Sequence, residues 1–200
     1  MHDSDNTRQA DHPIDEVFLD RWSPRSFTGE DIPVETLLGF FEAARWSPSS
    51  YNTQPWRFIW GRKGTPHFET LLGLLTGANP TWCKDASALV VVASAETMTM
   101  PGKDGPVPYY THSFDAGSAW MAFALQATKA GWYTHGMAGL NFAEAAKVLN
   151  VPNGFRVEAG FAVGKRGSAS QLIEPLQGLE KPSGRKPLAE TVFEGAMPAA

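Results

Sequence analysis

The chain reads RWSPRSF at residues 21–27 and, one helix length later, PSSYNTQPW at residues 48–56. The first stretch brings two guanidinium groups and two hydroxyl groups close together in sequence, where they can hold an anion. The second stretch offers consecutive short polar side chains and an amide pair, and it ends in an aromatic segment that favours extended backbone. A hydrophobic core requires neither pattern, so we expect both stretches to belong to a binding site.

Length, composition and charge favour one folded, mildly acidic domain. The chain has 200 residues, of which 42% are hydrophobic, and its seven tryptophans suit a well-filled core. Its net charge of −4 argues against a general nucleic-acid-binding surface. We expect residues 1–13 to form a flexible N-terminal arm and residues 14–200 to form a single domain.

The single cysteine, Cys83, excludes an intramolecular disulfide and suits a reducing compartment. No stretch approaches the roughly 20 apolar residues that a membrane-spanning helix needs. The N-terminus lacks the apolar segment of a secretory signal, and the histidines show no metal-ligand spacing with Cys83. We therefore expect a cytoplasmic protein that binds no metal, no nucleic acid and no membrane.

Hydrophobic periodicity predicts a mixture of helices and strands. The expected helices cover about residues 14–22, 33–46, 66–75, 115–130 and 141–149, and the expected strands cover 55–60, 86–95 and 156–163. Residues 96–111 are expected to form a surface excursion. The helix at 115–130 is apolar almost all round, which predicts burial on several sides or against a second subunit. Mixed helices and strands that do not form hairpins imply an α+β fold, with a sheet flanked by helices.

Basic residues at the two ends of the chain suggest a phosphate site. Arg21 and Ser23 lie two residues apart near a predicted helix end, so their guanidinium and hydroxyl groups can converge on one anion. Arg185 can supply a second guanidinium fork from the other end of the chain. The alternative is that these arginines pair with surface carboxylates.

Two further segments have the composition of ligand-binding loops. Residues 49–54 present hydroxyl and amide groups without charge, which match a heterocycle with alternating donors and acceptors, such as a flavin, or equally an ordinary capped loop. In the segment 133–141, Gly136 and Gly139 allow the backbone to approach a flat ligand. His135 beside them is either a proton donor or a local structural contact.

Taken together, these segments resemble the FMN-dependent nitroreductase family. The resemblance rests on the order of Arg-x-Ser-x-Arg-x-Phe, Pro-Ser-Ser-x-Asn-x-Gln-Pro-Trp, a buried strand, a hydrophobic central helix and a late Gly-Arg-Lys-Pro-Leu. It extends over nearly the whole chain. It implies a nitroreductase-like α+β fold with a central, mostly antiparallel sheet flanked by helices, in an intertwined homodimer.

The resemblance also implies which residues bind FMN. Arg21, Ser23 and Arg185 would hold its phosphate, and Arg25 would lie near N1 and O2 of the flavin, where a cation favours reduction. The remaining expected contacts are Trp22, Pro48, Ser49, Ser50, Asn52, Gln54, Asn79, Gly136, Met137, Ala138 and Gly139. Of these, Ser49, Ser50 and Asn52 would reach the flavin of the other subunit, and a backbone N–H of residues 136–139 would address N5.

The activity implied by the resemblance is hydride transfer from NAD(P)H, a transient co-substrate, through flavin N5 to a nitroaromatic, quinone or activated alkene. The mechanism would be ping-pong and would require no side-chain acid or base. Two alternatives remain open: a flavin enzyme of the same fold with different chemistry (dehalogenation, flavin fragmentation or semialdehyde reduction), and a flavin-binding protein without turnover. Trp82 and Ala138 replace a lysine and a glutamate of some members, so the substrate preferences of those members are not transferred.

Overall fold

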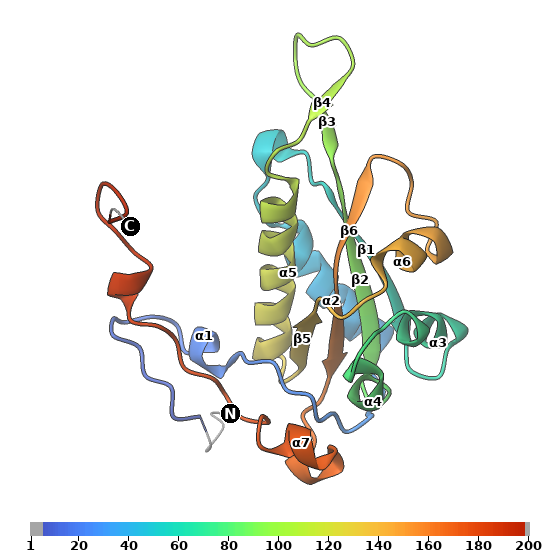
Figure 1. Ribbon diagram of the computed structural model, residues 1–200, viewed down its shortest axis with the longest axis vertical. Coiled ribbons are helices and arrows are strands. Elements are labelled where there is room, and N and C mark those ends of the chain that lie inside the picture. Colours follow the sequence, from blue (N-terminus) through green and yellow to red (C-terminus); the bar gives the residue numbers. More distant parts are fainter. Residues whose placement is uncertain (1–5, 199–200) are drawn as a thin grey trace.

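An antiparallel sheet of four strands in the order β1-β2-β6-β5 forms the centre of the fold. The computed structural model describes residues 6–198. The strands are β1 (Trp56–Arg62), β2 (Ala88–Ala95), β5 (Tyr133–Met137) and β6 (Phe155–Gly164). Helices lie on both faces of this sheet (Figure 1), which explains why β2 is buried along nearly its whole length. The predicted α+β fold with an antiparallel sheet is confirmed.

Alternate residues of β2 contribute to two hydrophobic cores, because successive side chains of a strand point to opposite faces. Leu89 and Val91 pack in one core with residues of α3 (Pro66–Gly73), α4 (Asn79–Cys83) and α6 (Phe142–Val148). Val90 and Val92 pack in the other core with residues of α2 (Val34–Arg45) and α5 (His112–Lys129).

Local signals account for several helix ends. Thr65 accepts a hydrogen bond from the Phe68 N–H at the start of α3, and Pro66 occupies the first turn. Asn141 caps α6 through the Glu144 N–H at 3.2 Å, as its sequence predicts. α2 ends at Arg45, shortly before Pro48, whose ring disfavours helical backbone at the residue that precedes it.

The chain ends run beside each other outside the sheet (Figure 1). The N-terminal part contains α1 (Val17–Asp20), and the C-terminal part contains η2 (Ala169–Gln171), α7 (Glu174–Gln177) and η3 (Leu188–Glu190). Of the predicted arm 1–13, residues 1–5 lie outside the described residues. Residues 6–13 carry neither helix nor strand, but Asn6 and Arg8 both donate hydrogen bonds to the Leu19 carbonyl. The flexibility of the arm stays a prediction.

The structure corrects four sequence-based expectations. Residues 133–137 form strand β5 rather than a glycine-rich loop, because Gly136 pairs with Phe161 of β6. A Cβ at Gly136 would lie 3.1 Å from the Trp120 ring, so a larger residue there would require that ring to shift by a few tenths of an ångström. The surface excursion contains a hairpin of β3 (Thr97–Thr99) and β4 (Pro106–Pro108). The first helix, α1, has only four residues, and α4 was not expected.

Candidate functional site

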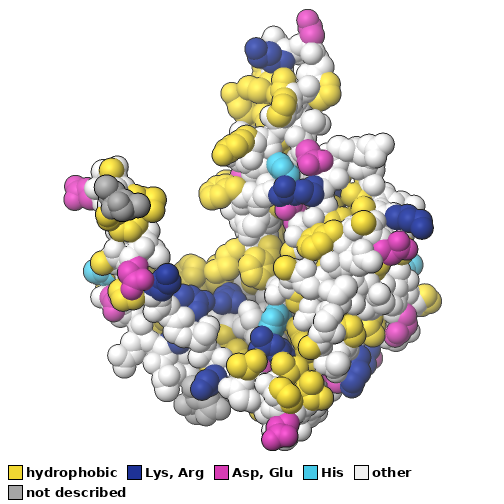
Figure 2. All heavy atoms as spheres, viewed as in Figure 1, with side chains coloured by type: hydrophobic (Ala, Val, Ile, Leu, Met, Phe, Trp, Pro, Cys, Tyr) yellow, Lys and Arg dark blue, Asp and Glu magenta, His cyan; other side chains and the backbone are white. Residues whose placement is uncertain are grey.

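A pocket lined by cations lies between α1, β5 and the C-terminal tail. Its volume is about 300 Å³, and five cationic side chains line it: Arg8, Arg21, Arg25, Lys181 and Arg185. Trp22, Ser23 and His135 also line it. The fold thus brings together the predicted phosphate-site residues from both ends of the chain. Lys181 belongs to the basic residues near the C-terminal end that the sequence offers for such a site, whereas Arg8 was not suggested by the sequence. Figure 2 shows basic side chains gathered in the hollow beside the projecting chain ends.

No carboxylate within residues 6–198 forms an ion pair with any of these five cations. Burial lowers the pKa of Arg21 below its ordinary value, and the charge of Arg185 lowers it further. The pKa of Arg8 is lowered by burial and then by the charges of Arg185 and Arg21. Arg8, Arg21 and Arg25 are partly buried, and Lys181 and Arg185 are exposed. Cations gathered in this way without an ion-pair partner are the arrangement expected of an anion site. The alternative of surface pairing with carboxylates is wrong for these arginines.

A buried carboxylate from the tail holds the backbone that carries Arg25. Glu180 accepts hydrogen bonds from the Arg25 N–H at 2.9 and 3.0 Å, one to each oxygen, and from the Ser26 N–H at 2.9 Å. Glu180 is only 8% exposed. Because the backbone amides occupy this carboxylate, the guanidinium of Arg25 stays available to the pocket. Nothing in the local sequence around Glu180 signals this role.

His135 projects from β5 into the wall of the cation pocket. Its Nδ1 lies 3.0 Å from the Pro24 carbonyl oxygen, and its ring centroid lies 4.7 Å from that of Trp82. Burial lowers the pKa of His135 to about 4, and the nearby charge of Arg25 contributes to this. The ring is therefore neutral near pH 7, which favours the structural contact over the proton donor.

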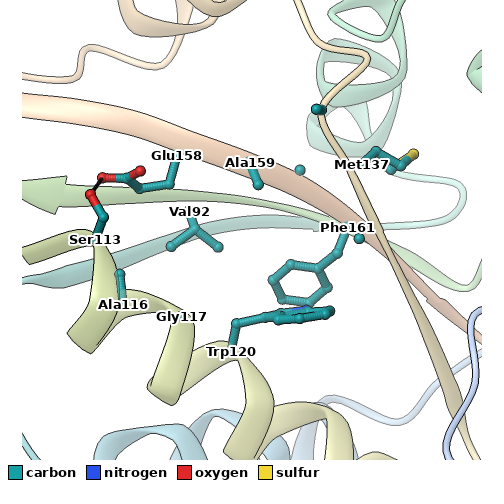
Figure 3. A pocket seen from close by; sticks show the side chains of 12 residues that line it. Val92, Ser113, Ala116, Gly117, Trp120, Met137, Glu158, Ala159 and Phe161 are labelled. Atoms are coloured by element: carbon teal, nitrogen blue, oxygen red, sulfur yellow. Dashed lines mark hydrogen bonds between the residues drawn. The ribbon is translucent and has the colours of Figure 1, made fainter. Parts of the chain in front are cut away.

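An apolar cavity of about 330 Å³ adjoins the cation pocket along β5. Gly136, which follows His135, lines it together with Met137, Ala138 and residues of β6 and α5. Figure 3 shows Trp120 and Phe161 toward one end of the cavity, with Glu158 and Ser113 toward the other end. The structure thus places three of the four predicted residues of segment 136–139 on one wall.

Gly139 and Asn79 lie beside this wall and contact each other. Asn79 Nδ2 donates a hydrogen bond to the Gly139 carbonyl at 3.1 Å, and a Cβ on Gly139 would lie 2.3 Å from that nitrogen. Neither residue lines the apolar cavity or the cation pocket. In this structure Asn79 holds the turn after β5, and its contact with a cofactor stays a prediction.

The polar end of the cavity has balanced charges, which sequence reasoning did not find. Glu158 accepts hydrogen bonds from Ser94, from Ser113 at 3.0 Å, and from Arg156 Nη2 at 2.9 Å. His112 Nδ1 lies 3.3 Å from the same carboxylate. Burial raises the pKa of Glu158, but the hydrogen bonds from Arg156 and the serines outweigh it, and the net pKa is lowered. The residues involved lie on three different elements, so no motif connects them.

The loop 48–54 does not reach either pocket in this chain. It contains η1 (Ser50–Asn52) and lies beside the start of α5, where the Ser50 N–H donates to Asp115 Oδ2 at 3.0 Å. None of the predicted contact residues in the loop (Pro48, Ser49, Ser50, Asn52 and Gln54) lines the cation pocket or the apolar cavity. Three of its residues, Tyr51, Asn52 and Gln54, have left-handed backbone with φ of 52°, 53° and 50°. Such a conformation is costly without glycine. The Ser50–Asp115 bond and two bonds within the loop, from Thr53 to the Ser50 carbonyl and from the Gln54 N–H to Ser49, help to hold it.

Two other classes of site are not found within the described residues. No helix there is both long and apolar enough to cross a membrane. No group of three or more His, Cys, Asp or Glu side chains within residues 6–198 is placed to hold a metal ion.

Comparison with known proteins identifies relatives over most of the chain. The sequence matches the model described as "Nitroreductase family" at residues 19–65 and 64–165. A crystal structure described as an oxidoreductase containing FMN is 42% identical, covers 100% of both chains and superposes with a TM-score of 0.93. An uncharacterized 15.4 kDa protein of Mycolicibacterium smegmatis is 32% identical over 70% of this chain and 95% of its own length. The chloronitrobenzene nitroreductase of Comamonas testosteroni is 41% identical over 44 residues, which are 22% of this chain and 19% of that enzyme.

Proposed function

Because this chain belongs to the nitroreductase family, we propose that it is an FMN-dependent oxidoreductase that uses NAD(P)H to reduce an electron-poor acceptor. The acceptor would be a nitroaromatic, a quinone or an activated alkene. The observation that carries this proposal is the cation pocket without carboxylates beside an apolar cavity. These two spaces match the two chemical parts of FMN, a dianionic phosphate and a flat ring.

The residues present fit that cofactor. Arg21, Ser23 and Arg185 line the cation pocket and would hold the phosphate, since guanidinium forks suit phosphate oxygens. Arg25 would lie toward the polar edge of the ring. When bound, FMN supplies the redox chemistry that connects NAD(P)H to the acceptor.

The surrounding residues determine how the ring is held and what reaches it. Gly136, Met137 and Ala138 present a wall without charged side chains, and such a wall suits the face of a flat ring. The neutral state of His135, set by burial, avoids a further positive charge beside five cations. Proton donation by a side chain is not needed in this proposal, so His135 acts as a support for the backbone at Pro24.

We further propose a homodimer in which each subunit contributes its loop 48–54 to the site of the other. The loop is preformed, carries Ser49, Ser50 and Asn52, and faces neither pocket of its own chain. Beside it, an open groove between α2 and α5 is lined by Trp46, which is 76% exposed, and by apolar residues of α5. Exposed apolar surface of this kind is expected at a subunit interface.

The visible spectrum of the purified protein tests the function. We expect a yellow protein whose flavin absorbance is lost on anaerobic addition of NADH or NADPH and returns when an acceptor is added. Colourless protein that takes up no FMN would contradict the proposal. Protein that stays oxidised under excess of both nicotinamide nucleotides would indicate flavin binding without turnover.

Mixing two variants tests the shared site. Arg21→Ala chains and Asn52→Ala chains each form defective homodimers, but a mixed dimer contains one site with neither substitution. After random exchange, about one quarter of all sites should therefore regain FMN binding. The control mixes Arg21→Ala with the double variant Arg21→Ala/Asn52→Ala, which offers no intact site. Recovery in neither mixture would rule out sharing between subunits.

A further inference from the structure

Arg8 lies in the cation pocket although it belongs to the N-terminal segment, which the sequence suggested to be a flexible arm. Its Nη1 donates to the Leu19 carbonyl at 3.1 Å and to the Arg21 carbonyl at 2.7 Å. Its Nε donates to the Ser183 carbonyl at 2.9 Å. One guanidinium thus connects the N-terminal segment, the end of α1 and the C-terminal tail around the pocket.

The hydrogen bonds of Arg8 leave part of its guanidinium free. Within residues 6–198, Nη2 has no hydrogen-bond partner and no carboxylate pairs with the side chain. Backbone carbonyls orient the planar group but do not neutralise its charge. An arginine that only tied the chain ends together would gain more from a carboxylate than from a position between two other arginines. Its fixed orientation and free nitrogen are features that favour recognition of an oxyanion.

We propose that Arg8 is a phosphate-binding residue that makes this site prefer a phosphorylated flavin to riboflavin. The inference rests on the proposed FMN function. Arg8 adds a third guanidinium to Arg21 and Arg185. Burial lowers the pKa values of Arg8 and Arg21 most, and the remaining part comes from repulsion between the cations, which a bound dianion relieves. Because Arg8 also bonds to Ser183, phosphate binding holds the two chain ends together over the pocket.

Flavin affinity with and without the phosphate group separates this role from a structural one. The full-length chain, freed of flavin, is titrated with FMN and with riboflavin, and quenching of flavin fluorescence gives both Kd values. In Arg8→Gln the FMN Kd should rise by about 10- to 100-fold, the usual effect of removing a hydrogen bond to a charged group. The riboflavin Kd should change less than about threefold. Arg8→Lys, which keeps the charge without the fork, should lie between wild type and Arg8→Gln.

Arg62 provides the matched control. It is also partly buried, and its Nη1 donates to the Ile32 backbone carbonyl at 3.3 Å, but it lines neither the cation pocket nor the apolar cavity. Arg62→Gln should leave both flavin affinities unchanged. If Arg8→Gln does not fold, Arg8→Lys alone tests the inference, because its FMN-to-riboflavin preference should still fall.

Three results would overturn the assignment. Equal loss of FMN and riboflavin affinity in Arg8→Gln would show that Arg8 only holds the chain ends together. An unchanged FMN Kd would place Arg8 away from the phosphate. An unchanged FMN Kd with a raised KM for NADPH, but not for NADH, would assign Arg8 to a nicotinamide phosphate instead. Wild-type protein that binds neither flavin would contradict the proposed function itself, which distinguishes that failure from the other three.

Discussion

The cation pocket includes His135 of β5 and the Glu158 cluster includes two residues of the neighbouring strand β6, and these two polar regions differ in charge balance. His135 of the pocket pairs with Ala162 on β6, and Glu158 lies further along that strand. In the pocket, five cations have no carboxylate partner among residues 6–198. In the cluster, Glu158 is matched by Arg156, Ser94 and Ser113.

This difference indicates that the charges of the Glu158 cluster stabilise the fold, whereas the charges of the cation pocket bind a ligand. The free-energy cost of removing the Glu158 carboxylate from water is offset by hydrogen bonds from groups of the same chain. For partly buried guanidinium groups without a carboxylate partner, the corresponding cost is offset only when an anion binds. The comparison therefore predicts opposite responses to substitution: loss of ligand affinity in the pocket and loss of folding stability in the cluster.

The largest expected effect is on cofactor affinity. Arg21→Ala should weaken FMN binding by about 100-fold, or about 2.7 kcal/mol, because it removes a charged phosphate contact. Riboflavin affinity should change little. Equilibrium dialysis with both flavins measures this, and Arg62→Ala is the control because that residue lies outside the pocket. Unchanged FMN content in Arg21→Ala protein would contradict the phosphate assignment.

The next effect concerns pH and the neutral state of His135. The folded protein keeps this ring uncharged down to about pH 4, whereas the unfolded chain binds a proton near pH 6.5. The unfolded state thus binds more protons between these values, so the free energy of unfolding should fall as pH decreases from about 6.5 to 4. We expect the loss from this group to be about 2 kcal/mol, less than full burial gives because the ring is partly exposed.

Urea unfolding of wild type and His135→Gln across this pH range measures that contribution. The variant should show a smaller decrease than wild type. His67→Gln, which changes an exposed histidine, should decrease like wild type. Parallel curves for wild type and His135→Gln would show that the pocket does not suppress protonation of this ring.

A smaller effect should follow from Glu158→Gln. At pH 7 the variant should lose about 1 to 2 kcal/mol of unfolding free energy, because Arg156 loses its counter-charge. The carboxylate has a lowered pKa in the folded state, so its stabilisation is present above the unfolded pKa of about 4.3 and is lost as pH falls through the folded value. Chemical unfolding at pH 7 and pH 3 should show the difference shrinking in acid. A changed preference between FMN and riboflavin in Glu158→Gln would contradict the separate roles of the Glu158 cluster and the cation pocket.

The smallest effect concerns the loop 48–54, which lines neither the cation pocket nor the apolar cavity. The hydroxyl group of Tyr109 donates to Asp115, the carboxylate that also holds the Ser50 N–H. Tyr109→Phe should lower the unfolding free energy by about 1 kcal/mol and weaken FMN binding a few-fold, because the loop loses one anchor. Tyr110→Phe is the control, since Tyr110 is 97% exposed. Thermal unfolding and FMN titration measure both effects, and equal behaviour of the two variants would contradict the anchor.

Elements with strong local patterns were predictable. The valine-rich run of β2, the apolar stripe of α2 and the Asn141 cap of α6 all depend on residues within a few positions of one another. β5 was missed because its glycine is justified by the distant Trp120 ring, which no local pattern encodes. α4 was missed because its five residues are too few to establish a helical period.

The sequence by itself determined most of the helix and strand pattern, suggested Arg21, Ser23 and Arg185 as phosphate ligands and, by resemblance, suggested Arg25 as a contact of the flavin ring. Only the tertiary structure added Arg8 and Glu180 and showed that the loop 48–54 lines neither the cation pocket nor the apolar cavity of its own chain. The bonds from Arg8 to Ser183 and from Ser26 to Glu180 join residues 175 and 154 positions apart. Periodicity, capping and motif spacing are local properties of the chain, whereas such contacts arise only when the two ends pack together.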